Sequence, residues 1–314
     1  MLAEELMKEK NNKSVTLRAF SIRCSKLSSN KSDYIEKLKE KLENTVVNDR
    51  RMRLSQQDPK KEEDLISYYN TNNEKNILFG TMLRITPGGD VAHITNELFK
   101  NKSFTIDELV NTKHDNYAAV YRGHYYFCMD DKHLITNLPT NKTITRLQTY
   151  VNFLLSSEDF ELTPIIISSP ENKLSDLKRI TVKNPFTDTL KKNRTENKSI
   201  RIDKNLFEIV KGLFKDTQNL DDVDLSQIIS AELILKLTKP RRMSEEEYQR
   251  LYGAYLKPIS DIDNISFKDK NGKQIKGKDV LKTKNVDIEI TETGELVEPQ
   301  LNQEMIKFLN ELKE

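Results

Sequence analysis

The stretch from Asn116 to Leu138 constrains the fold of this chain more than any other part of the sequence. It contains three short runs rich in aromatic and β-branched residues, Tyr117–Tyr121, His124–Met129 and His133–Leu138. Only Arg122-Gly123 and Asp130-Asp131-Lys132 separate them, and glycine and aspartate favour turns. Strands joined by such short connections pair antiparallel, because a parallel pair needs a crossover of a dozen residues or more. The stretch therefore predicts a three-stranded antiparallel meander.

Strands and helices follow one another along the rest of the chain without the regular alternation of a parallel sheet. The residue patterns predict strands at Val15–Arg23, Ile77–Ile85, Phe160–Ser168, Arg179–Asn184, Ser230–Lys239 and Val286–Thr291, with an Asn271-Gly272 hairpin within Ile265–Ile275. They predict helices at Asp33–Glu43, Glu62–Tyr69, Thr105–Val110, Thr143–Leu155, Leu206–Phe214, Ser244–Tyr255 and Asn302–Leu312. This arrangement indicates an α+β fold, mostly antiparallel sheets with segregated helices.

Two weak breaks suggest how the chain divides into domains. One lies near Pro185, and the other lies between Lys257 and Asp263. We therefore expect a globular α+β domain built from residues 14–184 and 264–314, with residues 185–263 forming a smaller inserted α+β domain. Residues 1–13 form an N-terminal extension.

Composition excludes several classes of protein. The 314 residues contain no apolar run long enough to span a membrane, and the N-terminus lacks the apolar core of a signal peptide. Cys24 and Cys128 form neither a zinc pattern nor a disulfide framework, so we expect reduced thiols in a cytoplasmic protein. Nine glycines leave little room for a glycine-rich nucleotide-binding loop.

No catalytic constellation stands out, and we expect no cofactor and no metal site. His124 and Cys128 share one side of a predicted strand near Asp130 and Asp131, but strand and turn roles explain these residues more simply. Neither a nucleophile elbow nor a phosphate-binding loop occurs. The spacing of glutamates and lysines carries no information about a nuclease site, because both residues are abundant.

Charge is unevenly distributed, although the net charge is only +2. Basic residues gather in Lys191–Lys204, around Lys236–Arg242 and in Lys268–Lys284, whereas Asp279–Glu314 is acidic. Clustered basic side chains neutralise phosphates and give affinity without sequence preference. The proposed binding residues are Lys191, Lys192, Arg194, Lys198, Arg201, Lys239, Arg241 and Arg242. Alternatively, these charges are ordinary solvated faces of a lysine-rich chain.

The order of segments from about residue 116 to residue 303 resembles the RexA-like family of phage-exclusion proteins. The segments that carry this resemblance are NYAAVYRGHYYFCMDDKHLITNL, FELTPIII, LKRITVKNP, LFEIVKGLF, LSQIISAELILKLTKPRRM, NISFKDKNGKQ and TETGELVEPQLNQ. The resemblance implies a homodimer with an RdgC-like globular domain and a second, swivelling domain. It further implies sequence-independent binding to double-stranded DNA and a separate membrane or effector partner.

The expected function is therefore that of a DNA-binding component of an anti-phage system. A metal-dependent nuclease or toxin effector is the first alternative, and a protein-interaction subunit of a defence complex is the second. The acidic residues Glu289, Glu292, Glu295 and Glu298 suggest a tail that covers the basic surface until a partner removes it.

Overall fold

Two antiparallel sheets organise the chain in the computed structural model, one in each of two compact units. Unit 1 comprises residues 1–138, 146–162 and 283–314, and unit 2 comprises residues 139–145 and 163–282. The structure describes residues 12–23, 33–53, 61–72, 76–87, 94–111, 117–139, 144–166, 177–183, 232–236, 238–240, 242–256, 265–269 and 271–313. Helices and a large antiparallel sheet confirm the α+β class.

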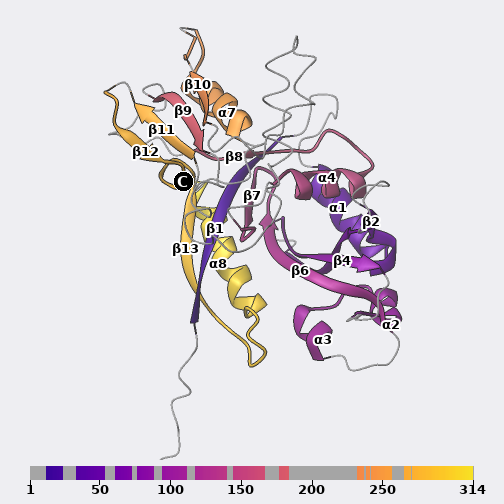
Figure 1. Cartoon of the computed structure of the whole chain (residues 1–314). Coiled ribbons are helices and arrows are strands. Elements are labelled where there is room, and N and C mark those ends of the chain that lie inside the picture. Colours follow the sequence, from indigo (N-terminus) through magenta and orange to yellow (C-terminus); the bar gives the residue numbers. More distant parts are fainter. Residues whose placement is uncertain are drawn as a thin grey trace, which may run out of the picture. The chain divides into compact units, whose positions relative to one another are not determined.

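Unit 1 is built on a nine-stranded sheet with the order β13-β1-β7-β6-β4-β3-β2, to which β5 adds beside β6 and β8 beside β1 (Figure 1). The strands are β1 (Asn12–Arg23), β2 (Met52–Arg53), β3 (Glu63–Asn72), β4 (Ile77–Pro87), β5 (Ile94–Thr95), β6 (Tyr117–Met129), β7 (His133–Thr136), β8 (Glu161–Pro164) and β13 (Thr283–Glu289). The sheet thus joins the N-terminal strand to the last strand of the chain.

The prediction of a helix at Glu62–Tyr69 is wrong, because these residues form most of strand β3. β3 lies between β2 and β4, and its residues from Glu63 to Ser67 are all buried. A strand covered on both faces shows no alternation of polar and apolar residues, so its sequence resembles a short buried helix.

The predicted meander is also corrected, because Arg122-Gly123 is not a turn. β6 runs through it without interruption, and the register against β4 shifts where Arg84 pairs with Gly123 and Ile85 with Tyr121. Arg122 is the extra residue of a β-bulge, which a local sequence pattern does not distinguish from a tight turn. The turn at Asp130 is as predicted, and β6 and β7 form a hairpin there.

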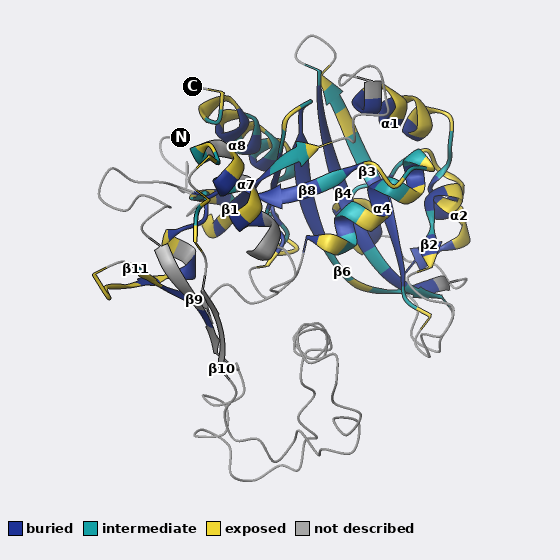
Figure 2. Cartoon of the chain, turned by 90° about the horizontal axis from the view of Figure 1, so that it is seen from above, coloured by how far each residue is buried: buried dark blue, intermediate teal, exposed yellow. Residues whose placement is uncertain are grey.

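Helices cover both faces of the large sheet. Unit 1 contains α1 (Asp33–Glu43), η1 (Val47–Arg50), α2 (Asn96–Lys100), α3 (Ile106–Asn111), α4 (Thr145–Leu155) and α8 (Glu298–Glu311). On β4, Thr81 contacts Glu298 of α8, whereas Arg84 shares Asp64 with Arg146 of α4. Residues three apart on a regular strand point to opposite faces, so α4 and α8 lie on opposite sides. Figure 2 shows the exposed outer surfaces of these helices in yellow.

Two buried charges in unit 1 each have several polar contacts. The guanidinium of Arg146 contacts both carboxylate oxygens of the buried Asp64, with 2.7 Å between Nη2 and Oδ1. Arg50 is buried as well, and its Nη2 donates to the carbonyl oxygens of Leu42 and Thr45, each at 2.6 Å. Such satisfied groups fix the geometry of the core, since an unpaired buried charge would cost several kcal/mol.

Unit 2 contains a four-stranded sheet with the order β10-β9-β11-β12. Its elements are β9 (Leu177–Lys183), β10 (Glu232–Lys236), α7 (Glu245–Leu256), β11 (Ile265–Asp269), β12 (Gln274–Lys276) and η5 (Gly277–Asp279). β9 and the β11–β12 hairpin therefore belong to unit 2 and not to the main domain to which residues 14–184 and 264–314 were assigned. β9 pairs with β10 on one side and with β11 on the other, and pairing between such distant segments is not visible in local composition.

Local hydrogen bonds in unit 2 agree with the sequence signals. The Ser244 hydroxyl accepts from the backbone N–H of Glu247 at 3.1 Å, and the Glu247 carboxylate accepts from that of Ser244 at 3.0 Å. This capping box begins α7. In the β11–β12 turn Gly272 has a φ of 82°, a conformation that glycine adopts without strain.

Candidate functional site

Most of the proposed DNA-binding residues lie outside the described part of the chain. Lys191, Lys192, Arg194, Lys198, Arg201 and Arg241 all lie there, as does the helix predicted at Leu206–Phe214. Two of the proposed residues are described. Arg242 is exposed, whereas the Lys239 ammonium pairs with Glu245 across 2.6 Å between Nζ and Oε2. Arg242 is thus accessible to a ligand, and Lys239 is partly neutralised.

The four-stranded sheet of unit 2 brings three other basic residues into one row. The register pairs Lys236 of β10 with Arg179 of β9, and Arg179 with Lys268 of β11. Residues directly opposite one another on neighbouring strands belong to the same face, with their Cβ atoms about 5 Å apart. The pairing therefore assigns three positive charges to one rung of the sheet.

The alternate positions of the same strands are apolar. Leu235, Ile180, Phe267 and Ile275 occupy the adjoining rung. Phe267 is fully buried, and its ring lies 5.9 Å from that of Tyr252 in α7. Tyr248 and Tyr252 are buried too, so their rings pack in the core of unit 2. Because α7 contacts the apolar face, the basic rung lies on the opposite one.

The next rung on the same face mixes apolar and polar residues. Ile234, Thr181, Ser266 and Lys276 occupy it; Thr181 and Ser266 are buried, while Lys276 is exposed. Lys268 is exposed as well. Like charges at directly opposite positions destabilise a sheet, and an anionic ligand against the row would compensate this repulsion.

Sequence reasoning identified the basic stretches that contain Lys236 and Lys268 but not the row itself. Arg179, Lys236 and Lys268 lie far apart in the sequence, and only strand pairing brings them together. The sequence signal that could have indicated the row is the alternation of these basic residues with apolar neighbours within each strand.

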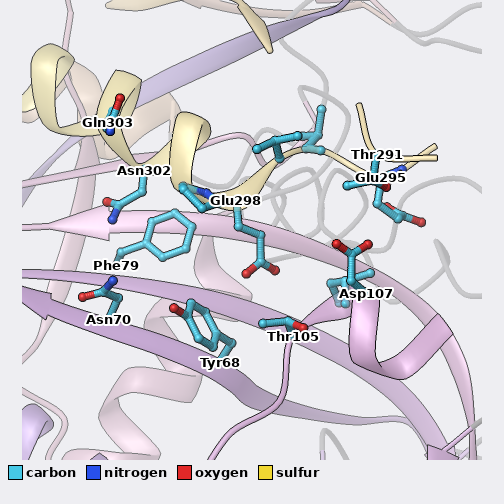
Figure 3. A pocket seen from close by; sticks show the side chains of 14 residues that line it. Tyr68, Asn70, Phe79, Thr105, Asp107, Thr291, Glu295, Glu298, Asn302 and Gln303 are labelled. Atoms are coloured by element: carbon cyan, nitrogen blue, oxygen red, sulfur yellow. Dashed lines mark hydrogen bonds between the residues drawn. The ribbon is translucent and has the colours of Figure 1, made fainter. Parts of the chain in front are cut away.

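A cavity of about 400 Å³ in unit 1 is the second candidate site. Its floor is formed by Tyr68 and Asn70 of β3 and Phe79 of β4, and α8 forms one wall (Figure 3). The other lining residues come from the start of α3, from the loop before α8 and from the first turns of α8. They are Thr105, Ile106, Asp107, Thr291, Glu295, Leu296, Val297, Glu298, Pro299, Asn302 and Gln303.

Carboxylates give this cavity its electrostatic character. Figure 3 shows the carboxyl groups of Asp107 and Glu298 turned toward the same space. Burial raises the pKa of Glu298 to about 7, and the negative charge of Asp107 adds to that shift, whereas a hydrogen bond from the Ile106 backbone opposes it. Burial also raises the pKa of Glu295. The cavity therefore holds titratable carboxyl groups, and its described lining residues include no lysine or arginine.

A neutral histidine supports the acidic side of the cavity. Burial and, to a smaller extent, the charge of Lys13 together lower the pKa of His124 to about 4. His124 Nδ1 lies 2.5 Å from the Tyr121 hydroxyl, and its Nε2 lies 3.5 Å from Glu295 Oε2. A neutral ring with its proton on Nε2 accepts from the tyrosine and donates toward Glu295. The histidine thus orients Glu295 without neutralising it.

The acidic residues suggested as a masking tail have a different structural setting. Glu295 and Glu298 line the cavity, and the Glu298 carboxylate accepts from the Thr81 hydroxyl at 3.5 Å. Glu289 lies in β13, and its backbone N–H donates to Gln300 of α8. Glu292 is exposed in the intervening loop. Sequence reasoning missed the cavity because its walls come from distant segments of the chain.

The described residues offer no other chemical centre. Among them, no group of three or more histidine, cysteine, aspartate or glutamate side chains is placed to hold a metal ion. Cys128 is a buried free thiol, and burial raises its pKa well above the usual range. No helix in the described ranges has both the length and the apolarity needed to cross a bilayer.

No protein-family model matches the chain, and no curated protein matches it significantly.

Proposed function

We propose that the chain binds the phosphate backbone of double-stranded DNA through the sheet of unit 2. The row of Lys236, Arg179 and Lys268 carries the proposal. Each residue faces another cation across the strand pair, an arrangement that becomes favourable when phosphates lie against it. Phosphate contacts of this kind carry no sequence information, so binding is independent of base sequence.

The basic segments elsewhere in unit 2 extend this proposal. Lys191–Lys204 carries six basic residues against two acidic ones, and Arg242 is exposed after β10. In this proposal they add phosphate contacts to those of the row, and a homodimer presents the basic surface twice. In this proposal the DNA-binding step belongs to an anti-phage system with a separate effector partner, and the resemblance to phage-exclusion proteins supports that assignment.

Incubation of the purified protein with plasmid and Mg²⁺ or Mn²⁺ tests the proposal on an agarose gel. Shifted but intact DNA is the expected result. Cut DNA would instead establish the nuclease alternative, and unchanged DNA at low salt would favour a protein-interaction subunit.

A charge-matched pair of variants identifies the surface. R179A/K236A/K268A removes the row, whereas K100A/K102A/K132A removes three exposed lysines of unit 1. The row variant should lose the shift, and the control variant should keep it. Equal binding by the two variants would refute the row as the contact surface, even if the wild-type protein binds DNA.

A further inference from the structure

We propose that the cavity of unit 1 binds a small aliphatic diamine or polyamine. Its volume of about 400 Å³ falls in the range of small-ligand sites. Asp107, Glu295 and Glu298 supply its charge, and no basic side chain among the lining residues cancels it. Extended cations with several ammonium groups match carboxylates that are distributed over more than one wall.

An unsatisfied polar group among the lining residues supports a ligand that donates hydrogen bonds. The amide oxygen of Asn302, which lines the cavity, is buried and accepts no hydrogen bond within the described part of the protein. Such an oxygen can only accept, so it requires a donor. An ammonium group offers three donors and no acceptor.

The Tyr126 hydroxyl supports the ionised form of Glu298 from beneath the cavity. Tyr126 is fully buried, and its ring stacks on that of Phe79 at 5.9 Å. A side-chain hydrogen bond from Tyr126 lowers the pKa of Glu298 and so opposes part of the shift caused by burial.

The apolar part of the lining suits the methylene groups of such a ligand. Tyr68 and Phe79 form the floor, and their ring faces also attract a cation. A metal ion fits less well, because no three described carboxylate, histidine or cysteine side chains converge on one point. The lining therefore favours an extended organic cation.

Proton release should accompany binding at mildly acidic pH. The pKa of Glu298 is about 7, so a fraction of this carboxyl is protonated near neutral pH, and a bound ammonium group favours its ionised form. Asp107 and Glu295 strengthen attraction for the cation, whereas Lys13 opposes it, and His124 remains neutral in this range. Affinity should consequently rise between pH 6 and pH 8, while the amines stay fully protonated.

Isothermal titration calorimetry of the full chain with spermidine and 1,5-diaminopentane tests the proposal. Both should bind, whereas 1,5-pentanediol, which has the same length and no charge, should not. Titration at pH 6.5 in two buffers with different ionisation heats should reveal proton release. Absence of heat with both amines at millimolar concentration and pH 8 would overturn the proposal, as would equal binding of the diol.

Variants of α8 localise the binding. E298Q should weaken spermidine binding about tenfold and abolish proton release, because a charge-assisted hydrogen bond is lost. E304Q is the matched control, since Glu304 lies on the same helix, pairs with Lys307 and does not line the cavity. A thermal melt verifies that each variant is folded. Equal affinities for the folded E298Q and E304Q proteins would show that the amine binds elsewhere and contradict the proposal.

Discussion

The two sheets of this protein present opposite charges by different structural means. In unit 2 the strand register aligns Lys236, Arg179 and Lys268 on one face of a small sheet. In unit 1 a helix and two loops close over the large sheet and enclose Asp107, Glu295 and Glu298 in a cavity. A net charge of +2 conceals both arrangements. Local charge therefore follows from strand pairing and enclosure, which overall composition does not report.

The two regions also differ in which charges the chain places next to one another. Asp64 is buried in unit 1 and held by two contacts from Arg146. The strand register of unit 2 places basic residues opposite basic residues. Removing one partner of the buried ion pair should therefore cost more stability than removing residues of the row.

Breaking the buried ion pair should have the largest effect on stability. R146M leaves the Asp64 carboxylate buried, with Arg84 at 3.8 Å as its remaining cation. We expect a loss of about 3 kcal/mol in the free energy of unfolding of unit 1, because an isolated buried charge is poorly solvated. Urea denaturation measures the loss, and a decrease below about 1 kcal/mol would mean that the pair is effectively solvated.

Close packing can be tested in each unit with one glycine. A Cβ atom at Gly80 would lie 2.5 Å from Phe127 Cζ in unit 1, and one at Gly253 would lie 2.7 Å from the Pro164 carbonyl oxygen in unit 2. G80A and G253A should each destabilise their own unit by about 1–3 kcal/mol through overpacking. Hydrogen exchange should quicken in β4 and β6 for G80A and in α7 for G253A. Faster exchange spread evenly over both units would contradict independent packing.

Local signals explain how much of this architecture is predictable from sequence. The Thr105 and Glu108 pair caps α3 as expected, with 3.2 Å from the Glu108 N–H to the Thr105 hydroxyl. The Asn271-Gly272 turn likewise needs only neighbouring residues. β3 was misassigned because burial on both faces removes its alternation. Neither candidate site was predictable in detail, because both assemble from residues distant in sequence.

The cavity should make the stability of unit 1 depend on pH. Folded Glu298 holds its proton up to about pH 7, above the ordinary value of 4.5. The stability that this carboxyl group contributes to the folded state is therefore fully present below pH 4.5 and is lost as the pH rises through 7. His124, with a pKa of about 4, has the opposite dependence between pH 4 and 6.5.

Comparison with E298Q isolates the contribution of Glu298. Relative to this variant, the wild-type protein should lose about 1–2 kcal/mol of stability between pH 4.5 and pH 8, after allowance for partial solvent screening. Urea denaturation across this range provides the measurement. Parallel stability curves for the two proteins would mean that the carboxyl is fully solvated.

Removing the basic row should have the smallest effect on stability, with the opposite sign. R179A/K236A/K268A relieves repulsion between cations at paired strand positions. We therefore expect the free energy of unfolding of unit 2 to rise, by no more than about 1 kcal/mol. Thermal denaturation without DNA measures this change. A loss comparable with that of R146M would show that the three residues support the fold.

The salt dependence of DNA binding tests the role of the row most directly. Fluorescence anisotropy of a labelled duplex gives the slope of log affinity against log salt for the wild-type protein, R179A/K236A/K268A and K100A/K102A/K132A. If each row residue neutralises one phosphate, the row variant should flatten the slope by about 2.7 units. The control variant should keep the wild-type slope. A row variant with unchanged affinity and slope, while the wild-type protein binds, would contradict the account.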